Sequence, residues 1–255
     1  MVELGLVLAV LMGIALGVLG GGGSILAVPI LVYAVGFDTK EAIAASLAVV
    51  GLTSLFGAIE HWRGGCLQYR AALIFGPITA VGAYLGAHLA GFLSGNVQLS
   101  MFAVVMVLAA IFMFMNGVSD DATEHVSKDS VWRLLVRFSL PGMAVGLLTG
   151  VVGVGGGFLI VPALVLLAGM PMRQAVGTSL PVIAMNSLAG FAGYIGEVEI
   201  PWDFLSLFTA LAVLGSFTGA YLARIIPQHA LKKSFAVFLV VMAAFILYES
   251  AGSIL

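Results

Sequence analysis

Small polar side chains recur in this sequence at spacings that would let them bind an anion. Ser46 and Thr53 are seven residues apart, so in a helix they share one face. Ser179 and Asn186 repeat that spacing in the second half of the chain. Hydroxyl and amide groups can donate hydrogen bonds to anionic oxygens. The repeated pattern favours a binding site, and hydrogen bonding between helices is the structural alternative for each residue.

Two glycine-rich segments precede these polar sets, one at residues 20–23 and the other at 153–157. Glycine runs end helices because glycine loses the most backbone freedom on ordering. The freed N–H groups at the start of the following half-helix carry partial positive charge and suit an anion without any Arg or Lys. Close helix packing is the alternative, and we expect it for the pairs Gly82/Gly86 and Gly215/Gly219.

The predicted substrate site combines the two glycine tips with the polar residues of the helices that follow them. Its members are Gly21, Gly22, Gly23, Ser24, Ser46, Thr53, Ser54, Gly155, Gly156, Gly157, Thr178, Ser179, Asn186 and Ser187. No catalytic residue, metal ligand or cofactor is predicted, because HExxH, GxSxG and CxxC motifs are absent. Whether Glu60, His61 or His88 relay protons or play interfacial and packing roles is left open.

The composition requires a lipid bilayer around these residues. Hydrophobic residues make up 62% of the chain and charged residues 9%, and the mean hydropathy is +1.18. An ordinary soluble domain carries about 25% charged residues. A net charge of −2 without any basic tract excludes a nucleic-acid binder. Charged residues are absent from the middles of the predicted spans, which favours an anionic or uncharged substrate over a cation.

Long apolar runs without alternation predict membrane helices and not the strands of a barrel. The runs are 2–36, 42–60, 69–93, 97–116, 134–169, 174–195, 202–226 and 230–250. A polar stretch at 117–131 indicates a linker between the two halves, and we expect this linker to be cytoplasmic. The chain therefore divides into a first membrane repeat at 1–116 and a second at 132–255.

The division rests on an internal repeat, in which the second half aligns on the first at a constant offset. Residues 17–57 align without a gap on 150–190, with 18 identities in 41 positions. Apolar identities often arise by chance in such a hydrophobic chain. The matched glycines and prolines, such as Pro29 with Pro162, are therefore stronger evidence for a repeat. A duplicated membrane unit follows from this alignment.

The first apolar run of each half is too long for one span and is broken by its glycines. It is either one kinked span or a hairpin that enters the membrane and returns. Residues 25–36 would reach only about 18 Å, whereas the hydrocarbon core is about 30 Å thick. A hairpin gives five segments per half and inverts the second half. Nine of the ten Lys and Arg residues then share one side, with Lys40 opposite, as the positive-inside rule favours.

We therefore predict an all-α polytopic membrane protein of two inverted-topology repeats with both termini outside. Each repeat would have a glycine-broken hairpin or discontinuous first helix plus three transmembrane helices. Broken helices at corresponding positions of two repeats indicate a transporter's binding site.

The sequence resembles the TauE/SafE family of sulfite exporters. The resemblance rests on paired G-x-x-G-x-G-G-[SG]-x-x-x-x-P motifs at 17–29 and 150–162, each followed by an A-x-x-x-S helix start at 42–46 and 175–179. It implies export of sulfite, sulfoacetate or another small organosulfur or carboxylate anion. It also implies a multi-pass protein of a prokaryotic inner membrane.

The leading hypothesis is a secondary transporter that exports a small oxyanion, such as sulfite or an organosulfonate, by alternating access. The anion would lie between the glycine tips. An anion channel is the alternative within transport, and an intramembrane enzyme and a non-transporting scaffold are the alternatives outside it. The expected partners are the small anionic substrate and the bilayer, and homo-oligomerisation is left open.

Overall fold

The computed structural model describes residues 2–115, 131–153, 156–194 and 200–252, together with Gly196 and Val198. Within these ranges the chain is helical and contains no strand. The first half contains α1 (Val2–Leu19), α2 (Gly22–Pro29), the π-helix η1 (Ile30–Val35), α3 (Thr39–Arg63), α4 (Tyr69–Ala90) and α5 (Gly95–Met115). The second half contains α7 (Val131–Val152), α8 (Gly157–Ala168), α9 (Met172–Tyr194), α10 (Trp202–Ile225) and α11 (Gln228–Gly252).

Five of these helices, α3, α4, α9, α10 and α11, are long and apolar enough to cross a membrane. Large apolar side chains remain exposed on the outside of the bundle, including Leu73 on α4, Leu214 on α10 and Val241 on α11. A contiguous apolar exterior on long helices is what lipid contact requires. The prediction of an all-α, multi-pass membrane protein is confirmed.

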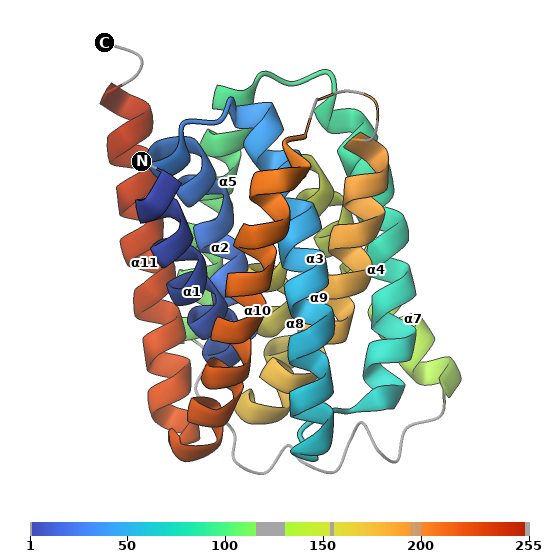
Figure 1. The fold of residues 1–255 in the computed structure, drawn as a ribbon. Coiled ribbons are helices and arrows are strands. Elements are labelled where there is room, and N and C mark those ends of the chain that lie inside the picture. The colour runs from blue at the N-terminus through green and yellow to red at the C-terminus, as the bar shows by residue number, and fades with distance from the viewer. Residues whose placement is uncertain are drawn as a thin grey trace.

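Both glycine-rich segments interrupt a helix and reverse the chain (Figure 1). α1 begins at the end of the bundle where α11 finishes, which we call the termini end. It runs deep into the bundle, and α2 with η1 then returns to the termini end (Figure 1). α7 enters from the opposite end, and α8 returns to that opposite end. Each half therefore starts with a hairpin that does not cross the bundle.

The helix boundaries follow the internal repeat. α3, α4 and α5 begin at Thr39, Tyr69 and Gly95, and α9, α10 and α11 begin at the positions that the repeat aligns with them, Met172, Trp202 and Gln228. The first segments α1 and α7 end at corresponding residues, Leu19 and Val152. The predicted linker at 117–131 lies outside the described residues except for Val131, the first residue of α7.

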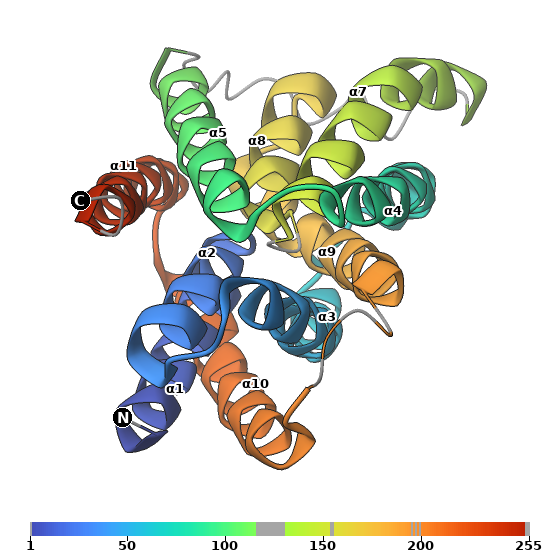
Figure 2. The same cartoon turned by 90° about the horizontal axis from the view of Figure 1, so that it is seen from above.

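Glycine stripes bring helices of different halves into contact. α1 packs against α10, and α7 packs against α4 (Figure 2). A Cβ on Gly215 or Gly219 would overlap carbonyl oxygens of α1, and a Cβ on Gly86 would overlap the Leu147 carbonyl of α7. A Cβ on Gly82 would lie 2.7 Å from the Met143 carbonyl oxygen. The packing role predicted for these four glycines is confirmed, because close backbone approach is what small-xxx-small stripes permit.

Lysine and arginine residues with described side chains gather at the end of the bundle opposite the termini. They are Arg63, Arg70, Arg173, Arg224, Lys232 and Lys233, at helix ends that lie together there (Figure 1). Lys40, at the start of α3, is the exception at the termini end among the described side chains. The two ends of the bundle therefore differ strongly in charge.

Candidate functional site

The two glycine breaks touch each other inside the bundle. A Cβ on Gly21 would overlap the Gly157 carbonyl, and a Cβ on Gly157 would lie 2.7 Å from the Ser24 Oγ. The breaks begin at Gly20 and Gly153, which have φ values of +66° and +74°. Only glycine adopts this left-handed conformation without strain. The tips of the two hairpins thus meet backbone to backbone, which any side chain at Gly21 would prevent.

The paired serines lie beside the breaks of the opposite halves. The Ser46 hydroxyl is 2.8 Å from the Ile43 carbonyl oxygen and 3.1 Å from that of Gly153, and donates to them. The Ser179 hydroxyl donates to the Val176 carbonyl at 2.8 Å, and a Cβ on Gly20 would lie 2.6 Å from its Oγ. Each hydroxyl has a single hydrogen, which is already used. In this arrangement the serines support the breaks and do not present a free donor.

Unpaired polar atoms occur one to two turns further along these helices. Thr53 Oγ1, Ser54 Oγ and Asn186 Oδ1 are buried and have no hydrogen-bond partner among the described residues. A buried polar atom left unpaired costs about 1–3 kcal/mol. Such atoms are rare in native proteins and call for an explanation. Two free hydroxyls inside a membrane bundle are suitable donors to a ligand.

These atoms belong to α3 and α9, two helices that pack against each other. A Cβ on Gly51 would lie 3.3 Å from the Ser187 Cβ, so the middle of α3 is in contact with the middle of α9. Asn186 also contacts the second break, because a Cβ on Gly156 would lie 3.0 Å from its Nδ2. The Asn186 amide donates to Thr149 Oγ1 at 3.0 Å. The centre of the candidate site is therefore the α3–α9 contact beside the hairpin tips.

Three of the predicted site residues have other surroundings. Thr178 Oγ1 accepts the Gln68 N–H at 3.0 Å and so holds the α3–α4 loop against α9. A Cβ on Gly22 would meet Leu19, and a Cβ on Gly23 would meet Leu16, so these glycines allow the first hairpin to close on itself. Gly155 lies outside the described residues.

Thr149 was not predicted from the sequence, although its hydroxyl is the partner of Asn186 and it is almost fully buried. Its counterpart in the first half is Leu16, so a comparison of the two repeats does not single it out. Only the packing of α7 against α9 brings it to the site. In the sequence, the one feature that could have indicated Thr149 is that it is a single threonine within an apolar run.

The helix-end residues Glu60 and His61 are part of an ionic cluster at the end opposite the termini. Glu60 Oε1 lies 3.2 Å from the Arg63 guanidinium, and its Oε2 lies 3.6 Å from that of Arg224. The His61 Nδ1 lies 3.2 Å from the Gly57 carbonyl oxygen within the same helix. Within the part of the chain that the structure describes, no group of three or more His, Cys, Asp or Glu residues could hold a metal ion.

Comparison with known proteins identifies the family. The family description "Sulfite exporter TauE/SafE" matches residues 5–246, which is nearly the whole chain. The chain belongs to the TauE/SafE family.

Several known proteins are similar to this TauE/SafE chain along most of their length. A "Probable membrane transporter protein" of Xylella fastidiosa (strain Temecula1) is 31% identical over 247 residues, which is 96% of this chain and 94% of the relative. The "Probable membrane transporter protein YdhB" of Bacillus subtilis is 30% identical, covering 90% of this chain and 92% of its own. No solved structure matches. The chain is thus a multi-pass member of a family of membrane transporters.

Proposed function

We propose that this protein is a secondary transporter that exports a small oxyanion, such as sulfite or an organosulfonate, by alternating access. The unpaired hydroxyls of Thr53 and Ser54 carry the proposal, because they are buried donors inside the bundle, on the helix that follows the first broken hairpin. Broken helices at corresponding positions mark the substrate sites of many secondary transporters. An oxyanion would supply the acceptors that these donors lack.

The placement of charged residues supports an anionic cargo. Every Asp, Glu, Lys and Arg of the described helices lies within the first or last two turns of its helix. A cation transporter or proton pump usually has carboxylates inside the membrane. Neutral hydroxyls, an amide and backbone N–H groups instead favour an anion that has shed part of its water.

The two halves, 1–116 and 132–255, are proposed to be inverted-topology repeats joined by a cytoplasmic linker at 117–131. The entry of α1 and α7 from opposite ends supports the inversion (Figure 1). The reciprocal contacts of α1 with α10 and of α7 with α4 support a two-fold relationship (Figure 2). The basic end opposite the termini would be cytoplasmic, so both termini would be outside.

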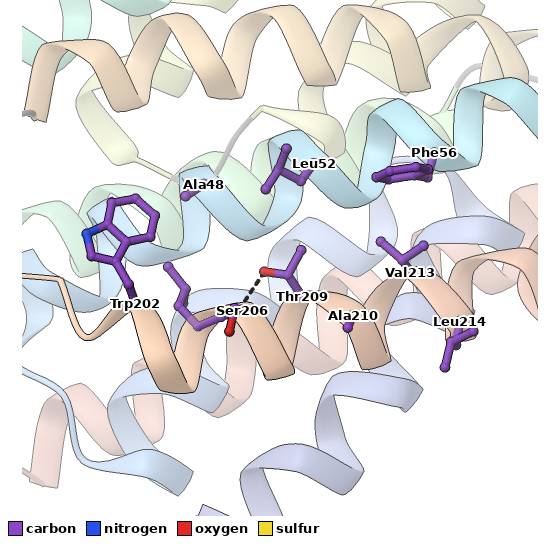
Figure 3. Close-up of a pocket in the computed structure, with 10 residues that line it drawn as sticks. Ala48, Leu52, Phe56, Trp202, Ser206, Thr209, Ala210, Val213 and Leu214 are labelled. Atoms are coloured by element: carbon purple, nitrogen blue, oxygen red, sulfur yellow. Dashed lines mark hydrogen bonds between the residues drawn. The ribbon is translucent and has the colours of Figure 1, made fainter.

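A difference between corresponding helix pairs supports alternating access. Between α3 and α10 the structure has an apolar groove of about 540 Å³, lined by residues such as Leu52, Trp202 and Thr209 (Figure 3). The corresponding pair in the other half is α9 and α4, where the Met185 methyl group lies against Gly76. Met185 and Gly76 are the counterparts of Leu52 and Thr209. One pair is parted where the other is closed, which is the kind of asymmetry between two repeats that alternating access would exchange.

Flux of labelled sulfite, sulfoacetate and a small carboxylate in proteoliposomes of purified protein tests this proposal. We expect saturable transport of at least one of them and accelerated exchange when the same anion is present on both sides. A unitary electrical conductance without saturation would identify a channel instead. Flux no faster than in protein-free liposomes for all three anions would contradict the proposal.

A further inference from the structure

A second cavity lies at the termini end, away from the hairpin tips. Its volume is about 180 Å³, and its lining includes Lys40 from the start of α3, His88 and Gly91 from the end of α4, and Gly193 and Tyr194 from the end of α9. The space is large enough for a polyatomic anion with part of its hydration shell, since a water molecule takes about 30 Å³ in the liquid.

The cavity presents hydrogen-bond donors. The Lys40 ammonium lies 3.4 Å from the Gly91 carbonyl oxygen, a single long contact that leaves two of its three hydrogens for a ligand. The Tyr194 hydroxyl accepts a hydrogen bond of 3.2 Å from the buried Gln98 amide of α5, so it anchors the end of α9 beside the cavity. The His88 Nδ1 lies 3.1 Å from the Tyr84 carbonyl oxygen and must donate to it. An ammonium group with unused hydrogens at a cavity favours an anion.

The charge of the surroundings makes Lys40 distinctive. The termini end carries Glu3, Asp38, Glu41 and Asp203 at helix starts. Lys40 is the one Lys or Arg among the described side chains at this end. An oxyanion that reaches this end is repelled by the carboxylates and attracted at the Lys40 cavity.

The repeat shows why the cavity exists at this end. The counterparts of Gly91 and Gly193 in the other half are Arg224 and Glu60. At the opposite end the Arg224 guanidinium donates to the Glu60 carbonyl oxygen at 2.9 Å and lies 3.6 Å from its carboxylate. Arg173, the counterpart of Lys40, donates to the Arg224 carbonyl at 3.1 Å. Side chains thus occupy the corresponding space at the opposite end, whereas two glycines leave it open at the termini end.

We infer that this cavity binds a small oxyanion through the Lys40 ammonium. The inference rests on the proposed function, because the occupant would be the exported anion after it leaves the hairpin tips. The same chemistry would accept an inorganic oxyanion from outside the cell. The cavity is distinct from the Thr53–Asn186 site and is its outer counterpart along the export path.

The test measures binding and transport separately. Purified protein is titrated calorimetrically with sodium sulfite, sodium sulfate and sodium chloride at constant ionic strength, and the external sulfite concentration for half-maximal exchange is measured in proteoliposomes. The variants are Lys40→Met, Lys40→Arg and Tyr194→Phe. Lys233→Met, an exposed lysine at the opposite end, is the matched control.

We expect Lys40→Met to weaken sulfite binding by about 10-fold and to raise the half-maximal external concentration similarly, because it removes a charged hydrogen bond. Lys40→Arg should restore most of the binding, and both Tyr194→Phe and Lys233→Met should stay within 2-fold of the unchanged protein. Preference for sulfite over sulfate would identify the exported anion as occupant, and equal binding would identify oxyanions in general.

Sulfite binding by Lys40→Met within 2-fold of the unchanged protein would overturn the inference, as would equal binding of chloride. The two proposals can fail separately. Oxyanion binding that depends on Lys40 without any flux would contradict only the transport function. Saturable flux with unchanged binding in Lys40→Met would contradict only the outer site.

Discussion

The Ser46 hydroxyl donates a 3.1 Å hydrogen bond to the carbonyl oxygen of Gly153, which lies 107 residues later in the chain. This bond joins α3 to the glycine break that follows α7. Ser179 has the corresponding position beside Gly20, and its hydroxyl donates to Val176 within its own helix. Each half thus helps to fix the hairpin tip of the other.

The Ser46–Gly153 hydrogen bond predicts that Ser46→Ala and Ser179→Ala differ in stability. Ser46→Ala should lose about 0.6 kcal/mol of stability, the average for hydrogen bonds between membrane helices. Ser179→Ala removes only a bond within one helix and should lose less. Thermal unfolding of both variants in the same detergent checks this, and equal melting temperatures would show that the Ser46–Gly153 bond is not stabilising.

The unpaired hydroxyl of Thr53 predicts that its removal weakens anion binding without lowering the stability of the protein. Thr53→Val should weaken anion binding by about 10-fold and should not lower the melting temperature, because it removes a donor without a protein partner. Thr79→Val is the control, since the buried Thr79 hydroxyl is hydrogen bonded to Phe75 and Gly76 carbonyls. That control should keep its affinity. Normal affinity in Thr53→Val would remove this residue from the site.

The contact between the hairpin tips predicts that a single methyl group stops transport. In Gly21→Ala the Cβ overlaps the Gly157 carbonyl, so the tips must separate. We expect loss of most flux in proteoliposomes with normal membrane insertion. Gly57→Ala is the control because its Cβ would lie 3.6 Å or more from its neighbours. Full flux in Gly21→Ala would show that the tips do not need this close contact.

The proposed inversion predicts opposite accessibility of two exposed residues. Asp203 lies in the first turn of α10 at the termini end, and Lys233 lies near the start of α11 at the opposite end. In a Cys66→Ser background, an impermeant maleimide should label Asp203→Cys in intact cells and Lys233→Cys only after lysis. Labelling of Lys233→Cys alone in intact cells would reverse the orientation, and equal labelling of both would reject the helix arrangement.

The Arg224–Glu60 contact predicts a way to open the end opposite the termini. Arg224→Gln removes a guanidinium that bonds to the Glu60 carbonyl and lies near its carboxylate. The native Cys66, half-buried in the α3–α4 loop, should then react faster with maleimide in purified protein. We expect an increase of about 3- to 10-fold, the range for a shift of roughly 0.7–1.4 kcal/mol. Lys233→Gln should leave the rate unchanged, and an unchanged rate in Arg224→Gln would rule out this closing role.

The sequence alone predicts the features that depend on local chemistry. Apolar length predicts the long helices, and the glycine runs predict where α1 and α7 end, because helix formation and its interruption are decided by neighbouring residues. The gapless internal repeat predicts the equivalent helices of the two halves. The glycine pairs predict close helix packing because the absence of a side chain matters wherever helices touch.

The tertiary structure decides which groups have partners. Ser46 and Ser179 are identical in the sequence pattern, yet one bonds to Gly153 and the other within its own helix. Thr149 reaches Asn186 only through the packing of α7 against α9. The repeat alone could not reveal these differences, because two copies with equivalent residues can adopt unequal arrangements. Partners far apart in the chain are selected by packing over the whole bundle, whereas helices and breaks are selected residue by residue.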